Sequence, residues 1–192
     1  MSRIEHNESD SVEDQLRYHA FAWNAHQALR GGRGQRILRE LEAALIALPE
    51  RRLIRGEFVT AAGEVCALGA LALRRKLATG RSVPVALAEI RQEFGSLDEQ
   101  NADVDCVDVG RALGIGEHIA WETIMQNDER REGCMPERQE GCTPERRYEH
   151  VLTWVRAMLA RPGGGMTSMR RRRDERGRHR REIRAPRRSP SR

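Results

Sequence analysis

The chain has 192 residues, of which 39% are hydrophobic, 4% aromatic and 33% charged, and its formal net charge is +5. This length suits one domain with one core. The longest apolar run, residues 65–73, is far shorter than the ~20 residues that a membrane-spanning helix needs, and the acidic residues 1–14 do not resemble a secretion signal. We therefore expect a cytoplasmic protein whose four cysteines are free thiols.

Charge is distributed unevenly along the chain. Residues 161–192 hold 13 arginines against Asp174, Glu175 and Glu182, a net charge of +10, which leaves −5 for residues 1–160. The arginine-rich segment has too few apolar residues to offset the entropy lost on ordering. We predict a disordered N-terminus over residues 1–10, a helical domain over residues 11–160 and a disordered tail over residues 161–192.

Apolar periodicity predicts two helices in the first 50 residues. The first runs from an N-cap at Ser11 to about Leu29, with Val12, Leu16, Ala20 and Trp23 at helical spacing, and the glycines at 31, 32 and 34 end it. The second ends at Pro49, and its apolar stripe comprises Ile37, Leu38, Leu41, Ala44, Leu45 and Leu48.

The middle of the chain predicts one extended segment and a central helix. Residues 53–60 mix β-branched and aromatic residues with charge, and residues 61–63 can turn the chain, so a short β-hairpin is expected. Residues 65–73 are apolar on nearly all sides, and Arg74, Arg75 and Lys76 follow them. This pattern is typical of a short helix at the centre of a core.

Four more helices are predicted in the second half. They cover residues 85–94, 103–114, 117–126 and 143–160. The last has the clearest start, with Thr143 as N-cap, Pro144 at the first helical position and Glu145 beside it. Its buried face comprises Tyr148, Val151, Leu152, Val155, Met158 and Leu159. The fold class is mainly α: a small single-domain helical bundle with at most one short β-hairpin.

A tandem octapeptide occupies residues 132–147, and only its second copy leads into an amphipathic helix. We interpret it as a duplicated helix start whose first copy lengthens a surface loop.

Several segments resemble those of a family of uncharacterised proteins found in bacterial genomes, phages and prophages. The segments are residues 34–41, 47–54, 63–70, 127–129 and 143–146, and the likeness covers most of residues 25–160. The resemblance implies a phage or prophage origin and supplies no activity, cofactor or site residue. The duplicated loop and the arginine tail depart from the family's pattern.

The tail is the candidate nucleic-acid site. Its candidate residues are Arg170, Arg171, Arg172, Arg173, Arg176, Arg178, Arg180 and Arg181. Such a polycation binds DNA or RNA by releasing counterions, with little sequence preference. The tail has no aromatic residue to stack on bases. Acidic protein surfaces are competing partners, and a tail without a selected role is the alternative.

Residues 107–125 offer a second nucleic-acid candidate, a helix-turn-helix centred on residues 111–115. The match is poor, because Ala120 and Thr123 stand where larger aliphatic residues are usual, and because Glu117 and Glu122 would repel phosphates. Ordinary helix packing is the simpler interpretation.

Three ligand motifs fail on spacing. Residues 30–34 lack the pattern of a phosphate-binding loop and predict a helix–helix turn. Cys134, Cys142 and His150 are eight apart, unlike zinc ligands. The aspartates at 103, 105 and 108 lack the glycine and final carboxylate of a calcium loop. We expect no metal and no cofactor.

Catalytic candidates are equally sparse. His118 and Glu122 lie four apart and could form an acid–base pair, whereas His19 and His26 flank Trp23 at a spacing typical of a half-buried surface. No serine or cysteine nucleophile has a base nearby in the sequence. We expect a non-enzymatic accessory protein of phage or prophage type with weak nucleic-acid contact through its tail. The alternatives are a protein-interaction or structural role without nucleic acid, and a helix-turn-helix regulator.

Overall fold

The structure is a computed structural model that describes residues 12–95, 106–128 and 143–161, without the side chains of residues 12–15 and 17. These ranges form seven helices and no β-strand: α1 (Val12–Arg30), α2 (Gly32–Ile46), α3 (Ala67–Ala78), α4 (Val83–Phe94), α5 (Cys106–Ala112), α6 (Glu117–Asp128) and α7 (Pro144–Ala160). The compact unit that contains them ends at Arg161. The predicted fold class, mainly α, is confirmed.

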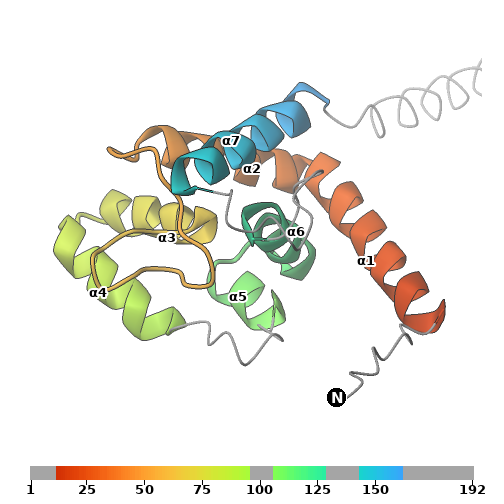
Figure 1. The fold of residues 1–192 in the computed structure, drawn as a ribbon, viewed down its shortest axis with the longest axis horizontal. Coiled ribbons are helices and arrows are strands. Elements are labelled where there is room, and N and C mark those ends of the chain that lie inside the picture. Colours follow the sequence, from red (N-terminus) through yellow and green to blue (C-terminus); the bar gives the residue numbers. More distant parts are fainter. Residues whose placement is uncertain (1–11, 96–105, 129–142, 162–192) are drawn as a thin grey trace, which may run out of the picture. The chain divides into compact units, whose positions relative to one another are not determined.

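Helix α6 is the central helix of the domain (Figure 1). It packs against α1, α3, α5 and α7. Helix α2 packs against α1, α3 and α7, and α4 packs against α3. Each of these helix pairs includes α2, α3 or α6, so these three helices hold the domain together.

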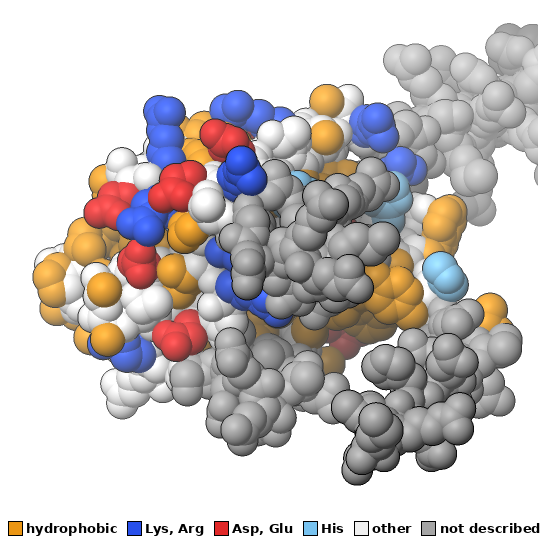
Figure 2. All heavy atoms as spheres, viewed as in Figure 1, with side chains coloured by type: hydrophobic (Ala, Val, Ile, Leu, Met, Phe, Trp, Pro, Cys, Tyr) orange, Lys and Arg blue, Asp and Glu red, His pale blue; other side chains and the backbone are white. Residues whose placement is uncertain are grey.

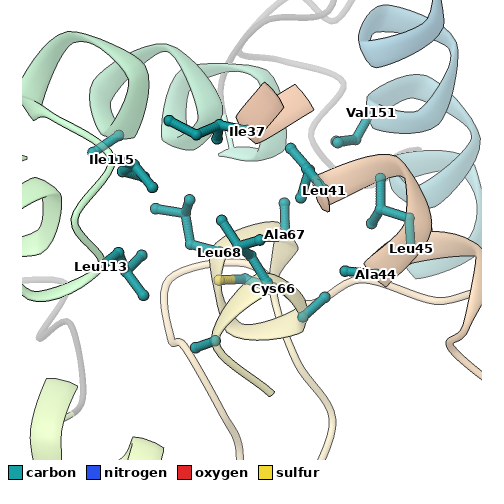
Figure 3. Close-up of a cluster of buried hydrophobic side chains, with 14 of the residues drawn as sticks. Ile37, Leu41, Ala44, Leu45, Cys66, Ala67, Leu68, Leu113, Ile115 and Val151 are labelled. Carbon is teal, nitrogen blue, oxygen red and sulfur yellow. The ribbon is translucent and has the colours of Figure 1, made fainter. Parts of the chain in front are cut away.

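The hydrophobic core lies where α2, α3, α7 and the α5–α6 turn meet (Figure 3). Helix α2 contributes the predicted stripe, with Leu41 and Leu45 at most 1% exposed. All residues of α3 from Ala67 to Ala72 are buried, which confirms the central position predicted for this helix. On α7, Val151 and Val155 are fully buried.

The segment between α2 and α3 folds back on itself as a minimal hairpin. Val59 and Val65 form an isolated antiparallel bridge, and the amide of Thr60 donates to the carbonyl of Glu64 at 2.9 Å. Phe58 is fully buried and stacks on Phe94 of α4, with ring centroids 4.4 Å apart. The predicted hairpin is thus a turn with one bridge, because the chain enters α3 directly after Val65.

Helix α1 forms where expected, but the stripe that predicts it does not face the core. Leu16 and Trp23 are each 63% exposed. The buried side comprises Ala25 and Leu29, with Phe21 half-buried against α6. The reason is that α1 packs on α6 and α2 through this second stripe, which lies on a different side of the helix.

The predicted start of the last helix is confirmed in detail. The Thr143 side chain accepts a hydrogen bond from the amide of Arg146 at 3.3 Å, and Pro144 is the first helical residue. Helix α2 ends at Ile46, two residues earlier than its apolar stripe suggested. Ser11, residues 1–10, the first octapeptide copy and residues 162–192 lie outside the described residues.

Two glycines allow segments of backbone to approach more closely than any side chain would permit. A Cβ atom on Gly69 of α3 would lie 2.1 Å from the carbonyl oxygen of Phe58. A Cβ atom on Gly34 of α2 would lie 2.2 Å from the carbonyl oxygen of Ala28 in α1. The hairpin segment is therefore held against α3, and α1 against α2, through bare backbone.

We predict that Gly69→Ala lowers the free energy of unfolding by about 2–3 kcal/mol, because the added methyl group must displace the backbone at Phe58. Gly32→Ala is the matched control, since a Cβ atom there has nothing within 4 Å. The control should be neutral or stabilising by up to about 1 kcal/mol. Urea unfolding followed by circular dichroism measures both. Equal stability of the two variants would contradict the close contact.

Candidate functional site

The eight tail arginines predicted to contact nucleic acid, Arg170 to Arg173, Arg176, Arg178, Arg180 and Arg181, lie outside the described residues. The site candidates that the structure does place are those of the helical domain. Two locations in this domain hold clusters of polar groups, the α5–α6 turn and the C-terminal end of α6.

Helices α5 and α6 meet at a tight corner of the kind found in helix-turn-helix motifs. Gly114 has a positive φ of 59°, and the amide of Ile115 donates to the carbonyl oxygen of Gly110 at 2.8 Å. A Cβ atom on Gly110 would lie 2.6 Å from the carbonyl carbon of Gly116. Two glycines thus permit the corner, one by its conformation and one by its small size.

The second helix of this corner is enclosed. Every residue of α6 is buried or half-buried, and Ala120 and Thr123, which matched the motif poorly, are at most 1% exposed. Glu122 is 7% exposed and accepts a hydrogen bond from Gln126 at 2.8 Å. A recognition helix needs a free face that can enter the major groove, and α6 uses its faces to hold other helices.

A groove of about 710 Å³ lies beside this corner, where the ends of α1 and α2 meet α5 and α6. Its apolar lining includes Ala28, Val107, Ile115 and Ile119, and its polar lining includes Arg33, Arg111, Glu117 and His118. The Arg33 guanidinium donates to the carbonyl oxygen of Gly114 at 2.8 Å, which fixes it at the groove. This volume is in the range of small-molecule sites.

His118 is the one titratable ring in the described lining of this groove. The ring packs edge-on against Phe21, with ring centroids 4.4 Å apart. Its Nε2 atom lies 3.7 Å from a carboxylate oxygen of Glu117. Its Nδ1 atom is buried without a hydrogen-bond partner among the described residues. The described lining holds no serine, threonine, cysteine or lysine. The groove therefore offers an acid–base group without a nucleophile beside it.

The glycine-rich segment at residues 30–34 is a helix–helix turn, as predicted. The amide of Gly31 donates to the carbonyl oxygens of Gln27 and Ala28, at 3.2 and 3.3 Å. Gly34 is buried against α1. This turn therefore joins α1 directly to α2, with the amide of Gly31 bonded back into α1.

Of the other ligand candidates, the structure describes only His150 and Asp108. His150 bonds to Gln126 at 3.1 Å, while Cys134 and Cys142 lie outside the described residues, as do Asp103 and Asp105. Asp108 forms an ion pair with Arg111. Among the described residues, no three His, Cys, Asp or Glu side chains could hold a metal ion.

The histidines of α1 also stand apart from any site. His19 lies against the ring of Tyr18, and His26 is half-buried. In the predicted pair, His118 contacts Phe21 and lies 3.7 Å from Glu117, whereas Glu122 accepts a hydrogen bond from Gln126.

Three buried polar side chains were not singled out by sequence reasoning. Gln35 donates to the carbonyl oxygens of Leu29 and Met158, at 3.0 and 3.2 Å, which ties α2 to the ends of α1 and α7. Arg147 donates to the carbonyl oxygen of Leu53 at 2.9 Å. The third is Asn127. Their signal in the sequence was a polar residue within an apolar helical stripe, which alone does not name its partner.

Asn127 and its neighbour Asp128 form a polar cluster at the end of α6. Asn127 accepts from the amide of Ala67 at 3.1 Å and donates to the carbonyl oxygen of Ile54 at 2.9 Å. It also donates to the Asp128 carboxylate. Burial raises the pKa of Asp128 above its usual 3.8, against the opposing effects of the Asn127 bond and of Arg147 and Arg55.

The nearby thiol of Cys66 has a structural role as the N-cap of α3. Its sulfur accepts from the amide of Gly69 at 3.3 Å and caps α3. Burial raises the pKa of Cys66 to about 12, so the thiol stays protonated and unreactive at neutral pH. Cys66 is a free thiol, as predicted.

Comparisons with known proteins identified no relative of this chain. No protein-family model matches the chain, and neither a curated protein nor a solved structure is significantly similar to it. The resemblance to bacterial and phage proteins therefore stays a prediction from the sequence. None of the helices in residues 12–95, 106–128 and 143–161 is long and apolar enough to cross a membrane.

We predict that Asp128→Asn stabilises the domain at pH 7. Because the pKa of Asp128 is raised on folding, the folded state holds this proton more tightly than the unfolded chain, and ionisation above pH 3.8 costs stability. Asparagine removes that cost and can still accept the Asn127 bond. The gain, read from urea midpoints, should vanish at about pH 2–3, where the acid is protonated in both states.

Asp108→Asn is the matched control, since the Asp108 side chain is 66% exposed and contributes little through its surface ion pair. An equal gain from Asp128→Asn at both pH values would show that shape, and not ionisation, is responsible.

Proposed function

We propose that this chain is a non-enzymatic accessory protein, of phage or prophage type, that contacts nucleic acid without sequence preference through residues 161–192. The observation that carries the proposal is the segregation of charge. Those residues hold 13 arginines and three acidic residues, while residues 1–160 have a net charge of −5. The proposal includes a place in the cytoplasm of a bacterial host, where nucleic acid is accessible.

Counterion release is the physical basis of the proposed contact. Each arginine that neutralises a phosphate frees condensed cations, so affinity depends steeply on salt and little on sequence. Arginine adds bidentate hydrogen bonds to phosphate oxygens. Because the segment contains no Phe, Trp or Tyr, it offers no stacking platform for bases. These features support binding to the backbone of duplex or single-stranded nucleic acid.

Features of the helical domain support placing the nucleic-acid contact in residues 161–192 and not in the helices. Its helix-turn-helix-like corner has an enclosed second helix, so a sequence-reading regulator is not the function we propose. The groove beside the corner holds Arg33 and Arg111, but Asp108 and Glu117 lie next to them. This near balance of charge gives the groove little attraction for a polyanion.

The non-enzymatic part of the proposal is supported by the surroundings of the catalytic candidates. His118 faces Phe21, and Glu122 bonds to Gln126, so the sequence pair does not act on a common point. The buried thiol of Cys66 is held protonated. Within the described residues, these were the groups with the best prospect of acid–base or nucleophilic chemistry.

A protein-interaction role is the second candidate, and one specific observation favours it. Leu16 and Trp23 are each 63% exposed on α1, a helix that packs against α2 and α6. Large exposed apolar side chains on one helix face are typical of a protein-binding surface. The two functions are compatible in one chain.

The test of nucleic-acid contact uses the full chain with all eight candidate arginines changed to glutamine. Binding to a random-sequence 30-base-pair duplex is followed by fluorescence anisotropy between about 50 and 200 mM salt. If each arginine contacts one phosphate, the log–log salt slope should flatten by up to about 7 units, and most affinity at low salt should be lost.

The matched control changes the same eight arginines to lysine, which keeps the charge and should retain most of the binding and the slope. Undiminished binding of the glutamine variant would show that these eight arginines do not make the contact and would contradict the proposal.

A further inference from the structure

The outward face of α1 differs from the rest of the described surface in its lack of charge. Residues 18–29 contain no Asp, Glu, Lys or Arg, and this stretch of 12 residues is the longest uncharged run in a chain that is 33% charged. Leu16 and Trp23 on this face are each 63% exposed, whereas Tyr18, which is 42% exposed, packs edge-on against Trp121 of α6 with ring centroids 5.6 Å apart. Hydrophobic and histidine side chains follow α1 at the right of Figure 2.

These side chains are exposed because α1 is held by α2 and α6 from its other side. Phe21 contacts His118 at 4.4 Å and Trp121 at 5.1 Å, which joins α1 to α6, and Ala25 and Leu29 are fully buried. A helix anchored in this way presents its outer residues in fixed positions. Leu16, Ala20 and Trp23 lie on one side of it, since they are four and three residues apart.

We propose that this outward face, defined by Leu16, Ala20 and Trp23, is an interface between two antiparallel copies of this chain. A two-fold interface requires that each residue face a complementary residue and be faced by it in return. Antiparallel pairing of α1 helices with Ala20 near the two-fold axis places Leu16 of each copy against Trp23 of the other. The small alanine at the crossing lets the helices approach closely.

The absence of charge selects a second copy as the occupant. Two identical charged faces repel each other, and the rest of this charge-rich chain would impose that cost on self-association. An uncharged face meets its own copy without like-charge contacts, so it is complementary to itself. A charged partner would form no ion pairs with residues 18–29, because these residues contain no Asp, Glu, Lys or Arg.

The exposed area is sufficient for a weak dimer. An aromatic side chain removes about 150–250 Å² from water when it is buried. Trp23 and Leu16, each 63% exposed, together supply on the order of 500 Å² over two copies, about half of the ~1,000 Å² at which specific interfaces begin, and the residues beside them on α1 supply the rest. We expect reversible association at micromolar to tens of micromolar concentration.

Sedimentation velocity of the full chain tests association, in about 0.5 M salt after nuclease treatment so that nucleic acid does not link copies. The mass should rise from 21.9 kDa toward twice that value as concentration increases. Trp23→Asp should weaken association roughly 30-fold or more, as loss of a hot-spot tryptophan does. Ile46→Asp is the matched control, at a 55% exposed apolar position on α2, and should leave association unchanged.

Cysteine cross-linking tests the antiparallel arrangement in a full chain whose Cys106, Cys134 and Cys142 are changed to serine. Ala20→Cys lies near the axis and should form a disulfide-linked dimer under mild oxidation. Gln27→Cys should not, because antiparallel pairing separates the two copies of residue 27 by about 20 Å, far beyond disulfide reach.

Linkage at both positions would indicate a parallel pair and overturn the proposal. A chain that stays monomeric at all concentrations, or a dimer that Trp23→Asp leaves intact, would overturn it as well. The proposed nucleic-acid contact does not enter these measurements, so either idea can fail without the other.

Discussion

The side chain of Asn127 is the contact on which the arrangement of the helical domain depends. Its amide joins the end of α6 to the first residue of α3, Ala67, and to the start of the hairpin segment at Ile54. Asn127 is 5% exposed. Each partner left unsatisfied at this depth would cost about 1–3 kcal/mol. The entry of the core helix α3, and therefore the packing of α2 and α4 on it, is set at this one point.

The positions of the helices were predictable from local sequence. Which face of each helix is buried depends on contacts between segments that are distant in the sequence. Thr143 and Pro144 gave the start of α7 to the residue, because a cap involves only its own turn. Helix α1 has two apolar stripes, and periodicity predicts a helix without saying which stripe is buried. The choice of Phe21 and Leu29 over Trp23 follows from where α6 and α2 lie, and single-sequence patterns do not contain that information.

The candidate site shows the same division. Gly110 and Gly114 meet the local requirements of a helix-turn-helix corner, and the turn lies between the two helices that the sequence predicted over residues 103–114 and 117–126. Whether such a corner can read DNA depends on the surroundings of its second helix. Ala120 and Thr123 are small, and both are buried among the helices that surround α6. The poor match at these two positions therefore has a structural cause, because small side chains let neighbouring helices pack closely.

The two proposed contacts of this chain respond to salt in opposite directions. The arginine-rich segment loses affinity for nucleic acid as salt rises, because counterions released into a more concentrated solution gain less entropy. The uncharged face of α1 is insensitive to screening, and its apolar association is slightly strengthened by salts that are excluded from protein surfaces. A dimer would bring two weak tails to one nucleic acid, so that the second tail binds at a high effective concentration. Avidity, and not the strength of a single tail, would then set how tightly the assembly holds nucleic acid at physiological salt.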